Sequence, residues 1–233
     1  MVNFFTARCC GIYYYIAVYI QLTLIAPLII KLVNSKFRGV GWVITPAAII
    51  VQYIMILAGK PISFPWSANN LFIWFIYYYI GILLGNNLIK YKINMAKTTI
   101  FLFICIAVQF FEAQLWYLYG DYGMATTQIK LTSMLTSIAV IFLSYSWMKI
   151  DSKQTGNKYI LIIHKFLLIT GDCSFGIYLS HVLVMYVLTK IFPLWNVLIF
   201  PLNSIFILML TLLCVLTGRK ILGKKLSKYM GLT

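Results

Sequence analysis

The chain has 233 residues, of which 62% are hydrophobic and only 10% are charged. Soluble proteins contain about 45–50% apolar and about 25% charged residues, so this composition excludes a water-soluble fold. Nineteen Lys and Arg against four Asp and Glu give a net charge of +15, but these charges fall between long apolar runs. There they indicate membrane topology, and no nucleic-acid partner is expected. The five cysteines contain no CxxC pair, so neither a metal site nor a disulfide framework is predicted.

Long apolar stretches account for most of the chain. A helix needs about 20 mainly apolar residues to cross the hydrocarbon core of a membrane. Stretches of about this length predict an all-α polytopic membrane protein with about seven transmembrane helices. In chain order, the predicted spans are residues 11–33, 39–59, 71–89, 98–118, 130–148, 173–192 and 195–218.

The basic residues between these spans predict the orientation of the chain, because cytoplasmic loops collect Lys and Arg. With seven spans, fifteen of the nineteen basic residues fall on one side. Only Arg8, Lys60, Lys130 and Lys190 fall on the other side. This distribution places the N-terminus outside and the C-terminus in the cytoplasm.

The connecting segments are short, so the chain is expected to form a single membrane domain over residues 1–233. Residues 158–168 are mainly apolar, with basic side chains at Lys158 and Lys165, and are too short to cross the membrane. We expect them to form an interfacial helix on the cytoplasmic face.

Glu112 is the first functional candidate, because ionisable groups inside membrane spans are costly and commonly functional. Gln109 lies three residues earlier, on the same helix face, where its amide could hold the carboxylate in a polar cavity. The alternative is that Glu112 lies near the outer surface and is hydrated. Gln21, in the first span, is a further polar group at membrane depth, and Pro27 is expected to kink that helix.

The start of the sixth span carries a second group of candidates. Ser174, Tyr178 and His181 follow one another at spacings of four and three, and therefore share one stripe of the helix. A neutral imidazole beside a tyrosine hydroxyl could relay a proton or position an acyl or hydroxyl group. The alternative is that these three side chains only form hydrogen bonds to neighbouring helices.

Three segments together resemble the membrane acyltransferase-3 superfamily. They are GIYYYIAVYIQLTLIAPLIIKL (residues 11–32), LFIWFIYYYIGILLG (71–85) and GDCSFGIYLSHVLVMYVL (171–188), of which the third is the most specific. The resemblance covers essentially the whole chain but not the whole family domain. Family members usually have about ten spans, and an Arg or Lys followed eleven residues later by a His begins their first span. The resemblance therefore implies an N-terminally truncated member that lacks about three spans and the catalytic histidine.

Lys153 and His164 have the spacing of that family motif but not its context. Lys153 lies in the polar segment DSKQTGNK, and His164 lies in the predicted interfacial helix. We interpret the match as chance. If it is functional, the pair lies on the cytoplasmic face, where an acyl donor would arrive.

The resemblance implies an integral membrane acyltransferase that transfers an acyl group, expected to be acetyl, to a hydroxyl of a carbohydrate or cell-envelope glycan. Acyl-coenzyme A is the implied donor, with no resident cofactor. His181, Tyr178 and Ser174 are then supporting groups, and Glu112, Gln109 and Gln21 are candidate acceptor contacts. The implied location is a bacterial plasma membrane, among membrane lipids and glycan-synthesis proteins. The alternatives are a non-catalytic partner in exopolysaccharide export or modification, and an inactive fragment without the catalytic span.

Overall fold

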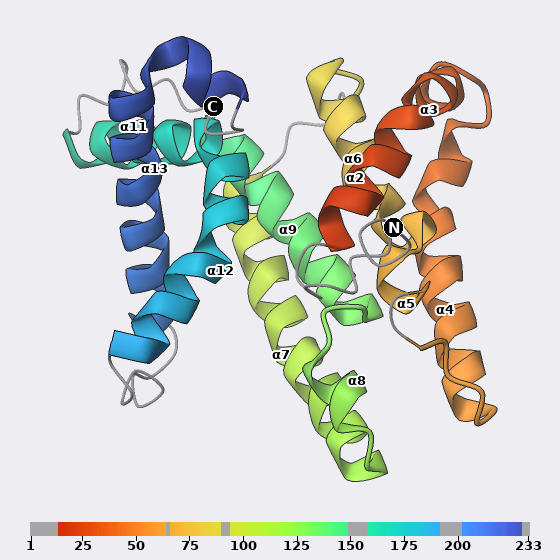
Figure 1. Ribbon diagram of the computed structural model, residues 1–233. Helices are drawn as coiled ribbons and strands as arrows, with labels where there is room; N and C mark the ends of the chain where they lie inside the picture. Colours follow the sequence, from red (N-terminus) through yellow and green to blue (C-terminus); the bar gives the residue numbers. More distant parts are fainter. Residues whose placement is uncertain (1–13, 64–65, 90–93, 149–157, 192–201, 230–233) are drawn as a thin grey trace. The chain divides into compact units, whose positions relative to one another are not determined.

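The computed structural model describes residues 14–63, 66–89, 94–148, 158–191 and 202–229. Within these ranges the chain forms helices and their connections, with no strand (Figure 1). Two compact units are distinguished, Met1–Lys149 and Ile150–Thr233, and each is described by itself.

The first predicted span is a broken helix. Helices α2 (Tyr14–Leu24) and α3 (Ala26–Val33) meet at an angle of 57°. Pro27 lies in the first turn of α3, where a proline is tolerated because the missing N–H would have no helical partner. The kink predicted at Pro27 is therefore confirmed. Residues 11–13 of this predicted span lie outside the described residues.

The second predicted span is shorter than expected. Its first part is a 3₁₀ turn, η2 (Arg38–Trp42), followed by helix α4 (Ile44–Leu57). The 14 residues of α4 extend over about 21 Å, whereas the hydrocarbon core is about 30 Å thick.

Helix α6 (Leu71–Gly85) is the centre of the first unit and follows the short helix α5 (Trp66–Asn69). Asn70 caps α6, because its side-chain oxygen accepts a hydrogen bond from the N–H of Phe72 at 3.1 Å. One side of α6 packs against α2 and α3, and another packs against α4 and α9 (Leu131–Met148). Buried Thr45 of α4 ties these helices further by donating to the carbonyl of Phe72 at 2.8 Å.

Helix α7 (Met95–Tyr119) packs beside α9, and short helix α8 (Tyr122–Thr126) connects them (Figure 1). Asn94 caps the start of α7 by accepting from the N–H of Lys97. Gly120 ends α7 at φ 89°, a left-handed conformation that glycine adopts without steric cost.

The second unit contains α11 (Lys158–Asp172), α12 (Ser174–Ile191) and α13 (Leu202–Tyr229). Buried Cys173, Leu212 and Val215 form its core. Figure 1 shows α11 running across the direction of α12 and α13, which is the geometry expected of an interfacial helix. Helix α11 extends four residues beyond the predicted end at Leu168, and its position at the membrane surface stays a prediction.

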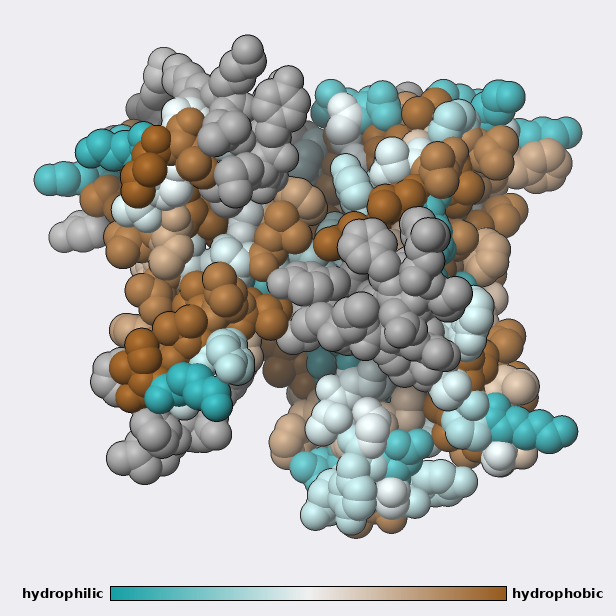
Figure 2. Space-filling view, viewed as in Figure 1, coloured by the Kyte–Doolittle hydropathy of each residue, from teal (hydrophilic) through white to brown (hydrophobic). Residues whose placement is uncertain are grey.

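Five helical stretches in the described residues are long and apolar enough to cross a membrane, or six if the bent pair α2 and α3 is one span. A polytopic membrane protein is therefore supported, but the predicted count of seven and the orientation are not confirmed. The predicted span that is not among these stretches is the second, which contains the shorter helix α4. Residues 192 and 195–201 of the last two predicted spans lie outside the described residues. Figure 2 shows hydrophobic residues over much of the helix sides and hydrophilic residues mainly toward the helix ends.

Candidate functional site

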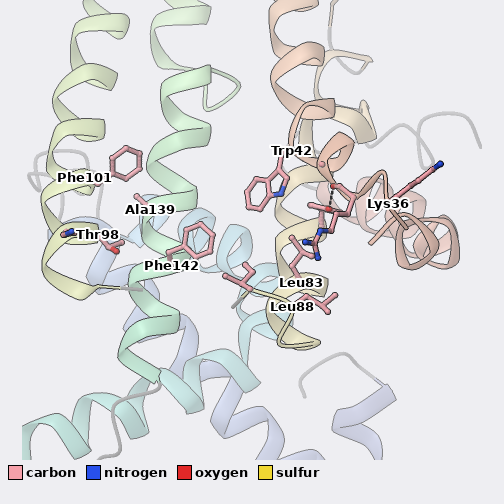
Figure 3. Close-up of a pocket in the computed structure, with 13 residues that line it drawn as sticks. Lys36, Trp42, Leu83, Leu88, Thr98, Phe101, Ala139 and Phe142 are labelled. Atoms are coloured by element: carbon pink, nitrogen blue, oxygen red, sulfur yellow. Dashed lines mark hydrogen bonds between the residues drawn. The ribbon is translucent and has the colours of Figure 1, made fainter. Parts of the chain in front are cut away.

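A cavity of about 940 Å³ lies within the first unit. Figure 3 shows Trp42, Leu83 and Leu88 on one side of it, and Thr98, Phe101, Ala139 and Phe142 on the other. The cavity therefore lies between η2 and α6 on one side and α7 and α9 on the other. Its volume is at the upper end of the range of about 300–1,000 Å³ for small-molecule sites.

The charge of this cavity is positive. Exposed Lys36, Arg38 and Lys97 are among its lining residues, and none of the described lining residues is acidic. Arg and Lys bind phosphate groups by charge-assisted hydrogen bonds. The remaining lining residues are mainly aromatic and aliphatic, so the cavity combines a cationic rim with apolar walls.

Tyr79 holds the η2 turn against the cavity. Its hydroxyl donates a hydrogen bond to the backbone carbonyl of Arg38, and its ring meets Trp42 edge-on, with the ring centroids 6.0 Å apart. Gly41 lies directly against the same ring, because a Cβ at this position would come closer than 3.0 Å to three ring atoms. Tyr79 is fully buried, so the turn that carries Arg38 and Trp42 is fixed to a rigid helix.

Glu112 belongs to a different polar cluster of the first unit. One carboxylate oxygen accepts from the hydroxyl of Tyr53, and the other accepts from the hydroxyl of Thr132. The backbone N–H of Leu131 donates to the Tyr53 oxygen at 3.0 Å. These bonds connect α4, α7 and α9, so both carboxylate oxygens are occupied by the protein itself.

Nearby Lys130 is only 2% exposed and donates to the carbonyl of Ala125 at 2.8 Å. Gln109 forms no hydrogen bond to Glu112 within the described residues, although the spacing of three predicted that contact. Glu112 instead accepts hydrogen bonds from Tyr53 of α4 and Thr132 of α9.

His181 contacts the backbone of its own helix in the second unit. Its Nδ1 lies 2.5 Å from the backbone carbonyl oxygen of Tyr178. Because a carbonyl can only accept, this contact favours the tautomer with the proton on Nδ1, which in a neutral ring leaves the lone pair on Nε2. The two rings are in contact, with centroids 5.6 Å apart, so Tyr178 and His181 share a face of α12. Ser174 is the first residue of the same helix, and a joint role of the three stays a prediction.

A family model described as an acyltransferase domain, acyltransferase-3, matches residues 1–219. The chain belongs to the acyltransferase-3 family. The match extends through the helices of both units as far as Arg219. No curated protein and no solved structure is similar enough to the chain to count as a match.

An acyltransferase-3 protein requires a site for the acyl donor and a base for the acceptor hydroxyl. The cationic cavity belongs to the first unit and His181 to the second, and each is described by itself. The cavity is not lined by any of the predicted site residues, namely His181, Tyr178, Ser174, Glu112, Gln109 and Gln21. Among the described residues, no group of three His, Cys, Asp or Glu is arranged to hold a metal ion.

The sequence alone does not single out Lys36, Arg38 and Lys97, which line the cationic cavity. Basic residues next to spans are common in membrane proteins, so their positions indicate topology first. Two loops that are expected on the same side of the membrane carry these three basic residues, and Trp42 follows Arg38 closely in the sequence. Together these features were a usable signal for a site. His164 lies in α11 as expected, whereas Lys153 lies outside the described residues.

Proposed function

We propose that the protein transfers an acetyl group from acetyl-coenzyme A to a hydroxyl of a cell-envelope carbohydrate in a bacterial plasma membrane. The family match supports a membrane acyltransferase in general. The identity of the donor, the acyl group and the acceptor is our inference.

The observation that carries the proposal is the cationic rim of the 940 Å³ cavity. Coenzyme A bears several phosphate groups, an adenine ring and a flexible arm that ends in the thioester. Lys36, Arg38 and Lys97 would bind the phosphates. Trp42 offers an aromatic ring to the adenine. The apolar wall formed by Leu83, Phe101 and Phe142 suits the uncharged thioester end.

The cavity lies on the side of the membrane where the donor is made, if the orientation given by the basic residues is correct. Lys36 and Arg38 lie between the first and second predicted spans, and Lys97 precedes the fourth. All three belong to the fifteen basic residues that we assign to the cytoplasm.

His181 would support the transfer step as a proton acceptor. With the proton on Nδ1, a neutral ring would carry its lone pair on Nε2, and the contact of Nδ1 with the Tyr178 carbonyl orients the ring. In the transfer, the acceptor oxygen would attack the thioester carbonyl, its proton would pass to a base, and coenzyme A would leave as the thiol. His181 would support this step by holding or relaying that proton.

The test is a transfer assay with radiolabelled acetyl-coenzyme A and native membrane vesicles of both orientations. Inverted vesicles are expected to form base-labile acetyl esters on carbohydrate, because their cytoplasmic face is accessible to the donor. Sealed right-side-out vesicles should form them only after permeabilisation. Replacing Lys36, Arg38 and Lys97 by Ala together should abolish labelling, whereas replacing exposed Lys60 should not. Labelling of lipid or protein in place of carbohydrate would contradict the proposed acceptor.

A further inference from the structure

A second hollow of the first unit, of about 370 Å³, lies between α2 and α6. These two helices pack side by side (Figure 1). Buried Val18 and Leu22 are among the residues that line it. We call it the aromatic groove, because five of its lining residues are aromatic. They are Tyr15, Tyr19, Trp74, Tyr77 and Tyr78.

The rings of the groove are arranged in pairs on its two helices. On α2, Tyr15 and Tyr19 are stacked with centroids 6.2 Å apart and an interplanar angle of 28°. On α6, the rings of Trp74 and Tyr77 have centroids 6.1 Å apart at 39°. Tyr15 and Tyr19 are about half exposed, so ring surface is open to a ligand on the α2 side.

Gly81 helps to keep the groove open. It lies on the same face of α6 as Trp74 and Tyr78, at spacings of seven and three residues. A Cβ atom at Gly81 would meet nothing within 4 Å, so the space beside it is empty. Any side chain larger than hydrogen would project into the groove without disturbing the helix.

Helix α6 therefore has two functional faces. Tyr79 and Leu83 face the cationic cavity, whereas Trp74, Tyr78 and Gly81 face the aromatic groove. Trp74 lies near the start of α6, whereas the cationic cavity extends past the end of α6 to Ile89. In the orientation that we propose, the groove begins toward the outer side and the cavity lies toward the cytoplasm.

We propose that the aromatic groove binds a neutral sugar ring of the carbohydrate acceptor. This inference rests on the proposed function, since it assigns a place to the acceptor of that reaction. The site is distinct from the cavity that we assign to the donor, and the two share no lining residue.

The chemistry of the groove fits such a ligand. None of the lining residues is charged, so the groove offers no opposite charge to a phosphate or a carboxylate. One face of a sugar ring presents C–H groups that stack on aromatic rings, while its hydroxyls form hydrogen bonds. Tyrosine supplies both parts, an apolar ring and a polar tip. A groove for a lipid chain needs no tyrosine hydroxyls, because hydrocarbon offers no hydrogen-bond partner to a polar group.

The test fills the groove and leaves the cavity unchanged. Gly81→Leu places a side chain in the open space and replaces a helical glycine by a better helix former. The matched control is Gly85→Leu, because Gly85 also lies in α6 with nothing within 4 Å of its Cβ position, but lines neither site. Tyr19→Ala is a second variant that removes an exposed ring.

The probes are the neutral tetrasaccharides of glucose and of N-acetylglucosamine, and acetyl-coenzyme A is measured on the same purified samples. We expect at least one tetrasaccharide to bind at millimolar concentration, and Gly81→Leu and Tyr19→Ala to weaken its binding about tenfold or more. Gly85→Leu should bind as the wild type does. Acetyl-coenzyme A binding should be equal in all four proteins.

Three results would overturn the groove proposal. In one, neither tetrasaccharide binds the wild-type protein, although acetyl-coenzyme A does. In another, a tetrasaccharide binds equally well to all variants. In the third, a photoreactive lipid labels the α2 and α6 residues of the groove and sugar does not compete. If the wild-type protein does not bind acetyl-coenzyme A, the proposed donor is contradicted instead. Failure of the groove proposal and failure of the proposed function are therefore distinguishable.

Discussion

The ring of Tyr79 occupies the space where any residue other than glycine at position 41 would place its Cβ atom. The hydroxyl of the same tyrosine donates a hydrogen bond to the backbone carbonyl of Arg38 in the same turn. One buried side chain of α6 thus fixes two points of the turn η2, and Arg38 and Trp42 reach the cationic cavity from there.

Gly41→Ala is therefore expected to displace the turn. Overpacking of this kind costs about 1–3 kcal/mol. Because the turn carries Arg38 and Trp42, we also expect weaker acetyl-coenzyme A binding. Thermal unfolding in detergent and donor titration check both effects. Gly39→Ala is the matched control for the unfolding measurement, since a Cβ there meets nothing within 4 Å. Gly39 lines the cavity, so Gly85→Ala, in open space outside it, is the control for the donor titration. Equal unfolding of Gly41→Ala and Gly39→Ala would contradict the contact with Tyr79.

The cluster around Glu112 predicts a stability effect that is not additive. Glu112→Gln replaces a charged acceptor, and Tyr53→Phe removes a donor to the same carboxylate. Each change should lower the free energy of unfolding by about 1–3 kcal/mol. The double variant should lose clearly less than the sum, because both residues belong to one network.

Denaturation of the two single variants and the double variant provides the measurement. Gln109→Leu serves as a control, since Gln109 has no hydrogen bond to Glu112, and it should unfold as the wild type does. Strict additivity of Glu112→Gln and Tyr53→Phe would show that the network does not act as one unit. A loss of transfer activity without loss of stability in Glu112→Gln would support the prediction that Glu112 contacts the acceptor.

His181→Gln should lower the maximal rate of transfer by about 10²–10⁴-fold if Nε2 accepts the hydroxyl proton. Glutamine can still donate a hydrogen bond, but it cannot act as a base. Tyr178→Phe is the matched control, because His181 bonds to the backbone carbonyl of Tyr178, which this change retains. Steady-state kinetics over a range of pH separates the roles. A base acts only when unprotonated, so loss of the fall in rate at low pH indicates a base, and a change in KM alone indicates a structural role.

The long apolar stretches of the sequence were sufficient to locate the long helices, but not the short helices α5 and α8. Each predicted span contains a helix, and the break near Pro27 was predicted because proline lacks the N–H that a helix interior requires. The length of α4 was not predictable in the same way. Residues 39–43 are apolar enough for a span, yet the turn η2 forms there, and Tyr79 binds it from a distant part of the chain.

The candidate site was only partly predictable. Tyr178 and His181 share a helix face because their spacing of three is a local property of the sequence. The partners of Glu112 and the cationic cavity depend on contacts between distant segments. Tyr53 and Thr132 lie 59 and 20 positions from Glu112, and Arg38 lies 41 positions from Tyr79. No local pattern specifies these pairings.

The most direct test of the account is the affinity of the purified protein for acetyl-coenzyme A, measured for the wild type, Arg38→Ala, Lys97→Ala and the control Lys60→Ala. A charge-assisted hydrogen bond to phosphate contributes about 1.5–3 kcal/mol, so each cavity variant should bind at least about tenfold more weakly. Lys60→Ala should bind as the wild type does, and added salt should weaken binding in all four. Equal affinity in all four proteins, or no binding by the wild type, would contradict the assignment of the cavity to the acyl donor.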